Sequence, residues 1–206
     1  MGNMNFWLWV VFLMISAANG CWEEERNALL ELHANMMSSN GGILAWGESG
    51  FVDCCSCYRV KCSLATGRVI KLDLRQARFG SMYGWNFNAS LFLPFKSLQV
   101  LILSQNYITG WTKIEGFDKL SHLTNLKVLD LQHNYLHPSV LSSVCWISSL
   151  EVLRLGGFTG GPTTGKGSAK CPGLSNLRVL LLEGYGINDI SVLSALGLLH
   201  ILDGRI

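Results

Sequence analysis

The sequence has few charged residues, few prolines and no apolar segment long enough to cross a bilayer. Charged residues make up 15% of the 206 positions, the formal net charge is +2, and there are four prolines. No basic stripe interleaved with aromatic residues occurs, so nucleic acid is not an expected partner. The apolar block at residues 6–15 is about half of the roughly 20 residues that a spanning helix needs. We therefore expect a soluble chain without a membrane span.

That short apolar block instead predicts a secretory signal peptide over residues 1–20. Small residues follow it, and Ala18 and Gly20 occupy the positions that signal peptidase inspects. Cleavage after Gly20 would start the mature, secreted chain at Cys21. The block has no preceding Lys or Arg, which a signal peptide usually carries. The alternatives are a membrane anchor, for which the block is short, and a bacterial lipoprotein, because a Cys follows the cleavage site.

Patterns that support catalysis or cofactor binding are missing. The spacing of residues does not indicate a Ser, His and acid set, paired carboxylates, or a cysteine with a base placed beside it. We therefore expect that the chain is not an enzyme. The five histidines are scattered, and His133 and His137 fall in a predicted turn, so we expect no metal site. The glycine-rich segment 156–173 lacks the GxxxxGK[ST] spacing. It is predicted to be a flexible return loop, and we expect no cofactor.

The sequence does contain an internal repeat. The pattern LxxLxLxxN recurs with starts 29, 28, 24 and 27 residues apart, a period typical of leucine-rich-repeat solenoids. The copies are Val69-Leu72-Leu74, Leu98-Leu101-Leu103-Asn106, Leu126-Leu129-Leu131-Asn134, Leu150-Leu153-Leu155-Phe158 and Leu177-Leu180-Leu182-Tyr185.

This spacing predicts an α/β fold, a right-handed solenoid with a short parallel β-sheet on its concave face. Alternate leucines of each strand point into a continuous core, and each coil touches only its neighbours. Asn106 and Asn134 are expected to bond the backbone of adjacent coils, whereas Phe158 and Tyr185 would interrupt that ladder. About five repeats fill residues 69–206, the last incomplete, because the coil begun at residues 193–202 stops at residue 206 without a cap.

Residues 21–68 are predicted to cap the N-terminal end of this solenoid. Three glutamates at residues 23–25 favour a helix start, and Leu29, Leu32 and Met36 follow at helical spacing to form an inward face. Seven cysteines in an exported chain should mostly form disulfides, with at least one left over.

The cap and the early repeats resemble plant leucine-rich-repeat receptor-like proteins and the related polygalacturonase-inhibiting proteins. The matching residues are Cys21, Glu25-Arg26, Ala28-Leu29-Leu30, Leu44, Trp46, Asp53-Cys54-Cys55, Val60, Cys62, the segment from Gly67 to Leu74, the segment from Asn88 to Phe92, and the segment from Gly116 to Leu120.

The resemblance implies disulfides between Cys21 and Cys54 and between Cys55 and Cys62. The family usually carries Trp at the position of Cys57, so this chain has an added thiol that could compete for Cys55 or Cys62. Cys145 and Cys171 lie at nearly equivalent points of adjacent coils. Two alternatives remain for these cysteines: a disulfide between them, or two buried thiols that pack as small apolar residues.

Two kinds of surface residue remain as candidate functional positions. Asn88 begins the only N-glycosylation sequon, Asn88-Ala89-Ser90. The outward strand positions form the candidate concave binding face, where a valine row is either an anchor for a partner or simply strand propensity. These positions are Lys71, Asp73, Arg75, Val100, Ile102, Ser104, Val128, Asp130, Gln132, Val152, Arg154, Gly156, Val179, Leu181 and Glu183.

By resemblance, the chain is expected to be the extracellular ligand-recognition module, in truncated form, of a receptor-like protein in plant defence or developmental signalling. The implied partner is a protein or peptide ligand, with a cell-surface co-receptor kinase as a second partner. The alternative is a freestanding secreted inhibitor of a cell-wall-degrading enzyme such as polygalacturonase. The expected location is the apoplast, or the plasma membrane for a fragment of a longer receptor.

Overall fold

A computed structural model describes residues 21–37, 46, 53–78, 84–111, 116–137, 139–157 and 174–183. Its elements are α2 (Glu23–Met37), η1 (Cys54–Ser56), β1 (Val60–Cys62), β2 (Val69–Asp73), β3 (Trp85–Phe87), η2 (Ala89–Phe92), β4 (Val100–Ile102), β5 (Ile108–Trp111), η3 (Phe117–His122), β6 (Val128–Leu131), α3 (Val140–Val144), β7 (Val152–Gly156) and β8 (Val179–Glu183).

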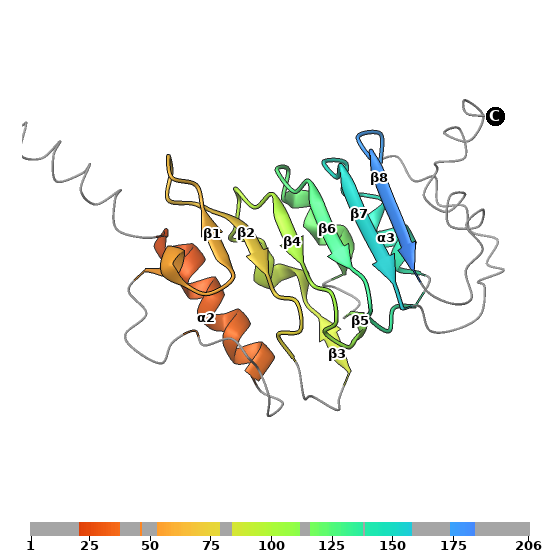
Figure 1. The fold of residues 1–206 in the computed structure, drawn as a ribbon, viewed down its shortest axis with the longest axis horizontal. Helices are drawn as coiled ribbons and strands as arrows, with labels where there is room; N and C mark the ends of the chain where they lie inside the picture. Colours follow the sequence, from red (N-terminus) through yellow and green to blue (C-terminus); the bar gives the residue numbers. More distant parts are fainter. Residues whose placement is uncertain are drawn as a thin grey trace, which may run out of the picture.

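The main sheet has one strand for each predicted repeat, plus one strand from the cap. Its order is β1-β2-β4-β6-β7-β8, and the strands from β2 to β8 are parallel (Figure 1). Equivalent repeat positions stack across the sheet. The successive register partners include Leu72, Leu101, Leu129, Leu153 and Leu180. The predicted leucine-rich-repeat architecture with a helical, disulfide-bonded N-terminal region is confirmed.

The repeat leucines form the core between the sheet and the return segments. All three leucines of the repeats beginning at Leu98, Leu126 and Leu150 are fully buried, whereas Leu177, Leu180 and Leu182 are only partly buried. The short helices η2, η3 and α3 lie behind the sheet (Figure 1), and their buried side chains belong to the same core cluster as the strand leucines.

A second, two-stranded parallel sheet of β3 and β5 was not predicted from the sequence. Trp85 pairs with Ile108, and Phe87 pairs with Trp111 across a register shift. Phe87 also stacks on Phe117, with ring centroids 4.2 Å apart. These aromatic contacts hold the return segments of adjacent coils together.

Two buried asparagines form the predicted ladder between coils. The Asn134 Oδ1 atom accepts hydrogen bonds from the backbone N–H groups of Asn106 and Ile108, at 3.0 and 3.1 Å. Its Nδ2 atom donates to the carbonyl oxygens of Leu103 and Leu131, at 3.0 and 2.9 Å. Asn106 makes equivalent bonds one coil earlier. Each amide thus satisfies backbone groups that the end of a strand leaves inside the protein.

One glycine is required where the chain leaves β7. Gly157 has φ = 72°, and a Cβ atom there would lie 1.9 Å from the Asn134 carbonyl oxygen. A side chain would therefore force the two coils apart.

Several predictions fall outside the described residues. They concern the signal peptide, Leu44, Phe158, Tyr185, Cys171, most of the glycine-rich segment and the last coil at residues 193–206. In the described parts of the chain, no helix is long and apolar enough to cross a membrane. Those parts also contain no group of three side chains that could hold a metal ion.

Candidate ligand-binding face

The candidate binding face is the outer surface of the main sheet, and its central part is mostly apolar. Val100, Val128, Val152 and Val179 are register partners on successive strands and form one continuous row. The first three valines are half-buried, and Val179 is 41% exposed. An apolar row of this kind contributes burial energy when a partner covers it.

Some predicted positions on this face contribute little accessible surface. Ile102, Ser104 and Asp130 are exposed by only 6%, 4% and 4%, because neighbouring strands shield them. Ile102 nevertheless lies outside the apolar core cluster that contains Leu101 and Leu103.

An ion pair lies beside the valine row. Arg154 Nη1 is 3.6 Å from Asp130 Oδ2, and Asp130 Oδ1 accepts a hydrogen bond from the Gln132 backbone N–H at 3.1 Å. The Arg154 side chain is 36% exposed and its partner carboxylate only 5%, so Arg154 is the member of the pair that a ligand can reach. Further along, His133 Nε2 lies 3.4 Å from Glu183 Oε2.

The N-terminal end of the face is basic and hollow. A hollow of about 420 Å³ lies over β1 and β2. Its lining residues are Tyr58, Arg59, Val60, Lys61, Lys71, Asp73 and Arg75. The sequence predicted Lys71, Asp73 and Arg75 as binding residues but missed Arg59 and Lys61. The only available signal was the alternation of Arg59, Val60 and Lys61, which is too short to identify a strand by itself.

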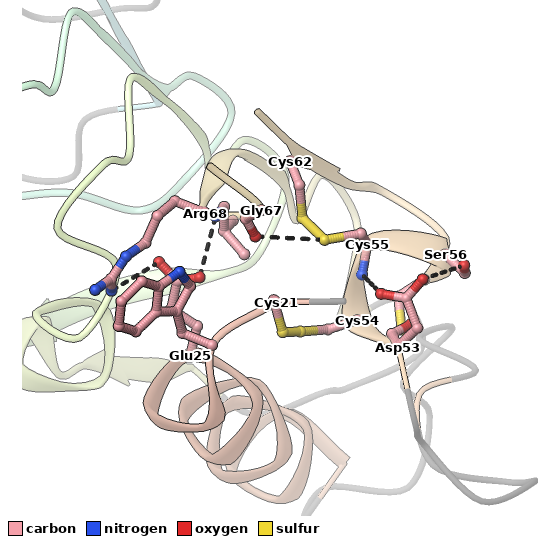
Figure 2. Close-up of a disulfide and its surroundings, with 12 residues drawn as sticks. Cys21, Glu25, Asp53, Cys54, Cys55, Ser56, Cys62, Gly67 and Arg68 are labelled. Carbon is pink, nitrogen blue, oxygen red and sulfur yellow. Dashed lines mark hydrogen bonds and ion pairs between the residues drawn. A yellow bond between two sulfur atoms is a disulfide. The ribbon is translucent and has the colours of Figure 1, made fainter. Parts of the chain in front are cut away.

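Two disulfides hold the cap next to this end of the sheet. Cys21 is bonded to Cys54 and Cys55 to Cys62, with Cα atoms 5.6 and 5.4 Å apart (Figure 2). These are the pairs that the resemblance implies. Asp53 orders the intervening turn, because its carboxylate accepts hydrogen bonds from the Cys55 N–H and the Ser56 hydroxyl, both at 2.8 Å.

Among the described residues, Cys57 is a thiol outside these disulfides. It is half-buried, and its Sγ atom lies 3.7 Å from the Asp53 carbonyl oxygen. Burial, reinforced by the charge of Asp53, raises the pKa of Cys57. Cys145 is buried, with its Sγ atom 3.4 Å from the Ser142 carbonyl oxygen. Its pairing with Cys171 stays a prediction.

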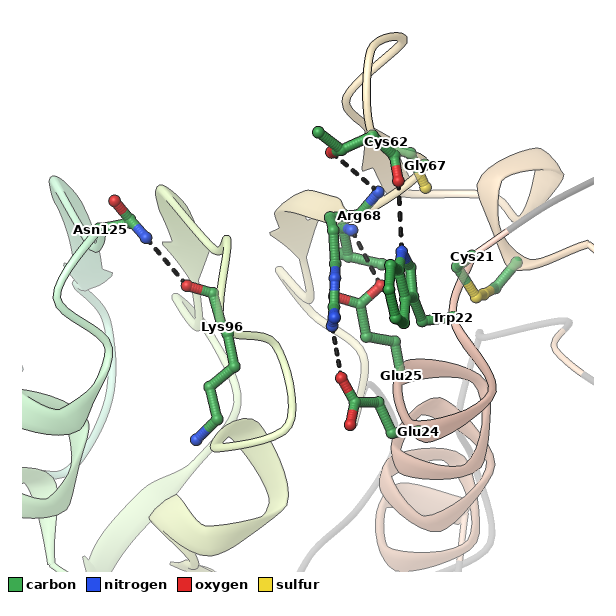
Figure 3. A network of polar contacts seen from close by, with 12 residues as sticks. Cys21, Trp22, Glu24, Glu25, Cys62, Gly67, Arg68, Lys96 and Asn125 are labelled. Atoms are coloured by element: carbon green, nitrogen blue, oxygen red, sulfur yellow. Dashed lines mark hydrogen bonds and ion pairs between the residues drawn. A yellow bond between two sulfur atoms is a disulfide. The ribbon is translucent and has the colours of Figure 1, made fainter. Parts of the chain in front are cut away.

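A polar network joins the cap helix to β2. The Arg68 guanidinium lies over the Trp22 ring, 3.7 Å from its centroid, and forms ion pairs with Glu24 and Glu25 (Figure 3). Glu25 is fully buried, and its Oε2 atom accepts a hydrogen bond from the Val69 N–H at 3.1 Å. Burial raises the pKa of Glu25, although the Val69 hydrogen bond and Arg68 oppose the shift.

The sequon residue Asn88 lies at the start of η2, on the return side of the molecule. It is half-buried, and its Oδ1 atom accepts a hydrogen bond from the Ser90 N–H at 2.8 Å. A glycan on Nδ2 would leave that oxygen free to cap the helix. Glycosylation of Asn88 remains a prediction.

Comparison with known proteins connects this architecture to one plant family. No protein-family model matches the chain. Over 98% of its length the chain is 61% identical to Cuscuta receptor 1 of Solanum lycopersicum, and over 94% it is 36% identical to receptor-like protein 9a of Arabidopsis thaliana. The chain belongs to the plant receptor-like proteins. It spans about a fifth of these curated relatives, 19% and 20% of their lengths.

Solved structures similar to this receptor-like protein chain include two plant ectodomains. The BIR2 ectodomain of Arabidopsis thaliana is 24% identical, with a TM-score of 0.41, and the match covers 66% of this chain and 71% of that chain. The leucine-rich-repeat ectodomain of the receptor kinase SOBIR1, from the same species, is 19% identical, with a TM-score of 0.43, and the match covers 80% and 97%. The relation to polygalacturonase-inhibiting proteins stays a prediction.

Proposed function

We propose that this chain is an extracellular ligand-recognition module of a plant receptor-like protein and that it binds a peptide or protein on its concave face. The observation that carries the proposal is the in-register outer face of β2, β4, β6, β7 and β8. There an apolar valine row lies between charged groups. A central apolar strip with a polar rim is the usual composition of a protein-binding surface.

In the described part of the chain, the other side of the sheet is occupied by return segments. The helices η2, η3 and α3 cover it, and a glycan on Asn88 would add bulk there (Figure 1). The curated relatives are called receptors or receptor-like proteins, which supports recognition rather than catalysis. We propose that the chain has no enzymatic activity, acts in defence or developmental signalling, and has a cell-surface co-receptor kinase as its second partner.

Site-specific photo-crosslinking of the full chain tests this proposal. A photoreactive amino acid would replace Gln132, directly after β6 on the concave face, or Asp118, an exposed residue of the return helix η3. Both proteins would be incubated with plant extracellular fluid, and the captured species would be identified by mass spectrometry. We expect a discrete partner at position 132 that is missing at position 118.

The identity of the captured species decides between the two candidate functions. A peptide or a cell-surface kinase supports the receptor proposal, whereas a pectin-degrading enzyme supports the inhibitor alternative. Equal capture at positions 118 and 132 would contradict recognition by the concave face.

A further inference from the structure

The described residues that line the hollow over β1 and β2 include four cationic side chains and one carboxylate. Arg59 and Lys61 come from β1 and its preceding turn, and Lys71 and Arg75 come from β2 and the residues after it. Asp73 is the only acid among the described lining residues, which together carry an excess of three positive charges.

Two of these cations lie directly opposite one another. Lys61 and Lys71 are partners in the antiparallel pairing of β1 with β2, so both side chains leave the same face of the sheet. Like charges at such positions destabilise a sheet. Lys71 Nζ is 4.0 Å from the Asp73 carboxylate, and its side chain stays 40% exposed. The pair therefore carries a stability cost that an added anion would relieve.

The remaining contacts orient the cations without neutralising all of them. Asp73 lies 3.9 Å from Arg75 as well as near Lys71, so one carboxylate serves two cations. The Arg59 guanidinium donates to the uncharged carbonyl oxygen of Arg75 and lies 5.1 Å from the centre of the Tyr58 ring. Arg59 is thus fixed at the edge of the hollow while keeping its charge.

The basic surface ends abruptly at the next strand, which limits the size of the anion. The register partners of Lys71 and Asp73 on β4 are Val100 and Ile102, and the acid Asp130 follows on β6. A long polyanion would need basic residues on successive strands. A peptide with one or two acidic residues followed by apolar ones matches the observed order.

We infer that the hollow over β1 and β2 is a subsite for the acidic end of a peptide ligand, whose apolar part continues along the valine row. The inference rests on the proposed recognition function and specifies its ligand class. Carboxylates would sit between Lys61, Lys71 and Arg75, because charge-assisted hydrogen bonds favour these groups over neutral amides.

Binding of two defined peptides to the full chain tests the subsite. One fluorescent peptide has two adjacent glutamates followed by valines, and its counterpart has glutamines instead. By fluorescence anisotropy at low salt, we expect the acidic peptide to bind about tenfold more tightly. Raising the salt from about 0.05 M to about 0.5 M should remove most of that preference.

The variant K61E separates the ligand effect from folding, because the two readouts move in opposite directions. It replaces the like-charged pair with an opposite pair, so we expect Tm to rise by about 1–2 °C. It should also abolish the preference for the acidic peptide. The control K96E makes the same charge change at an exposed lysine outside the hollow and should preserve that preference.

Three outcomes would overturn the subsite. They are equal binding of the two peptides, equal loss in K61E and K96E, or tighter binding of oligogalacturonate than of the acidic peptide. If a native ligand crosslinks at position 132 but binds K61E as tightly as the unmodified chain, the subsite fails while the proposed recognition function stands.

Discussion

At the scale of single residues, Asn134 shows how one side chain stabilises two coils. The substitution N134A would leave the buried N–H groups of Asn106 and Ile108 without their acceptor. Since an unsatisfied buried group costs roughly 1–3 kcal/mol, we expect a loss of about 3 kcal/mol in the free energy of unfolding. Urea denaturation of the full chain measures this loss.

The matched control is N176A, because Asn176 is exposed and donates one hydrogen bond, to the Ser148 carbonyl oxygen. Its loss should stay below about 1 kcal/mol. Equal destabilisation by the two substitutions would contradict the role of the buried ladder.

Glu25 makes stability depend on pH at the junction of α2 and β2. Because burial raises its pKa in the folded chain, the folded state binds this proton more tightly than the unfolded state. The resulting stabilisation is present below the ordinary glutamate pKa and is lost as pH rises through the raised value. E25Q retains an oxygen for the Val69 N–H but cannot ionise, so its Tm relative to the native chain should fall as pH decreases from about 7 to about 5.

Thermal unfolding of both proteins across that range measures the difference. E23Q is the control, since Glu23 is an exposed glutamate in the same helical turn. A Tm difference between E25Q and the native chain that does not change with pH would contradict the assignment to Glu25.

At the scale of elements, the cap depends on correct cysteine pairing. We expect non-reducing peptide mapping to find Cys21–Cys54 and Cys55–Cys62, with Cys57 as a thiol. Since its pKa is raised, alkylation of Cys57 by iodoacetamide should be slow at neutral pH and accelerate well into the alkaline range. C57S should fold with the same disulfides. A Cys57–Cys62 peptide in the native chain would show that the implied pairing does not apply.

The strands that could be predicted from sequence are those with a strong repeating pattern. The LxxLxL spacing identified β2, β4, β6, β7 and β8, because inward leucines must alternate in every coil. It missed β1, β3 and β5, which have three or four residues each and depend on pairing with distant segments.

The same limitation explains why the sequence did not predict the part of the basic hollow that β1 contributes. Lys71, Asp73 and Arg75 were predicted because they occupy the outward positions of the first repeat strand. Lys61 lies next to them only because β1 pairs with β2 in an antiparallel register. Burial also depends on neighbours, so the low exposure of Ile102 and Asp130 could not be seen in the pattern of one strand.

At the scale of the whole molecule, the chain should be exported, processed and glycosylated on the side away from its binding face. Expressed in plant cells, the secreted product should begin at Cys21 and lose mass on glycosidase treatment. N88Q should remove that mass change without altering binding at the concave face. Terminal sequencing and mass spectrometry read both properties. Residues 1–20 retained on the exported product would contradict the signal peptide.

The antiparallel strand β1 closes one edge of the main sheet, so further repeats can be added only on the other side of β2. It has three residues, presents Lys61 on its exposed face and is fastened through Cys62, and short, charged edges of this kind discourage strand addition. New coils can therefore be accommodated only beyond β2, where each parallel strand is a template for the next. In evolution, duplication or loss of repeats would lengthen or shorten the recognition face at its far end while leaving the basic hollow in place.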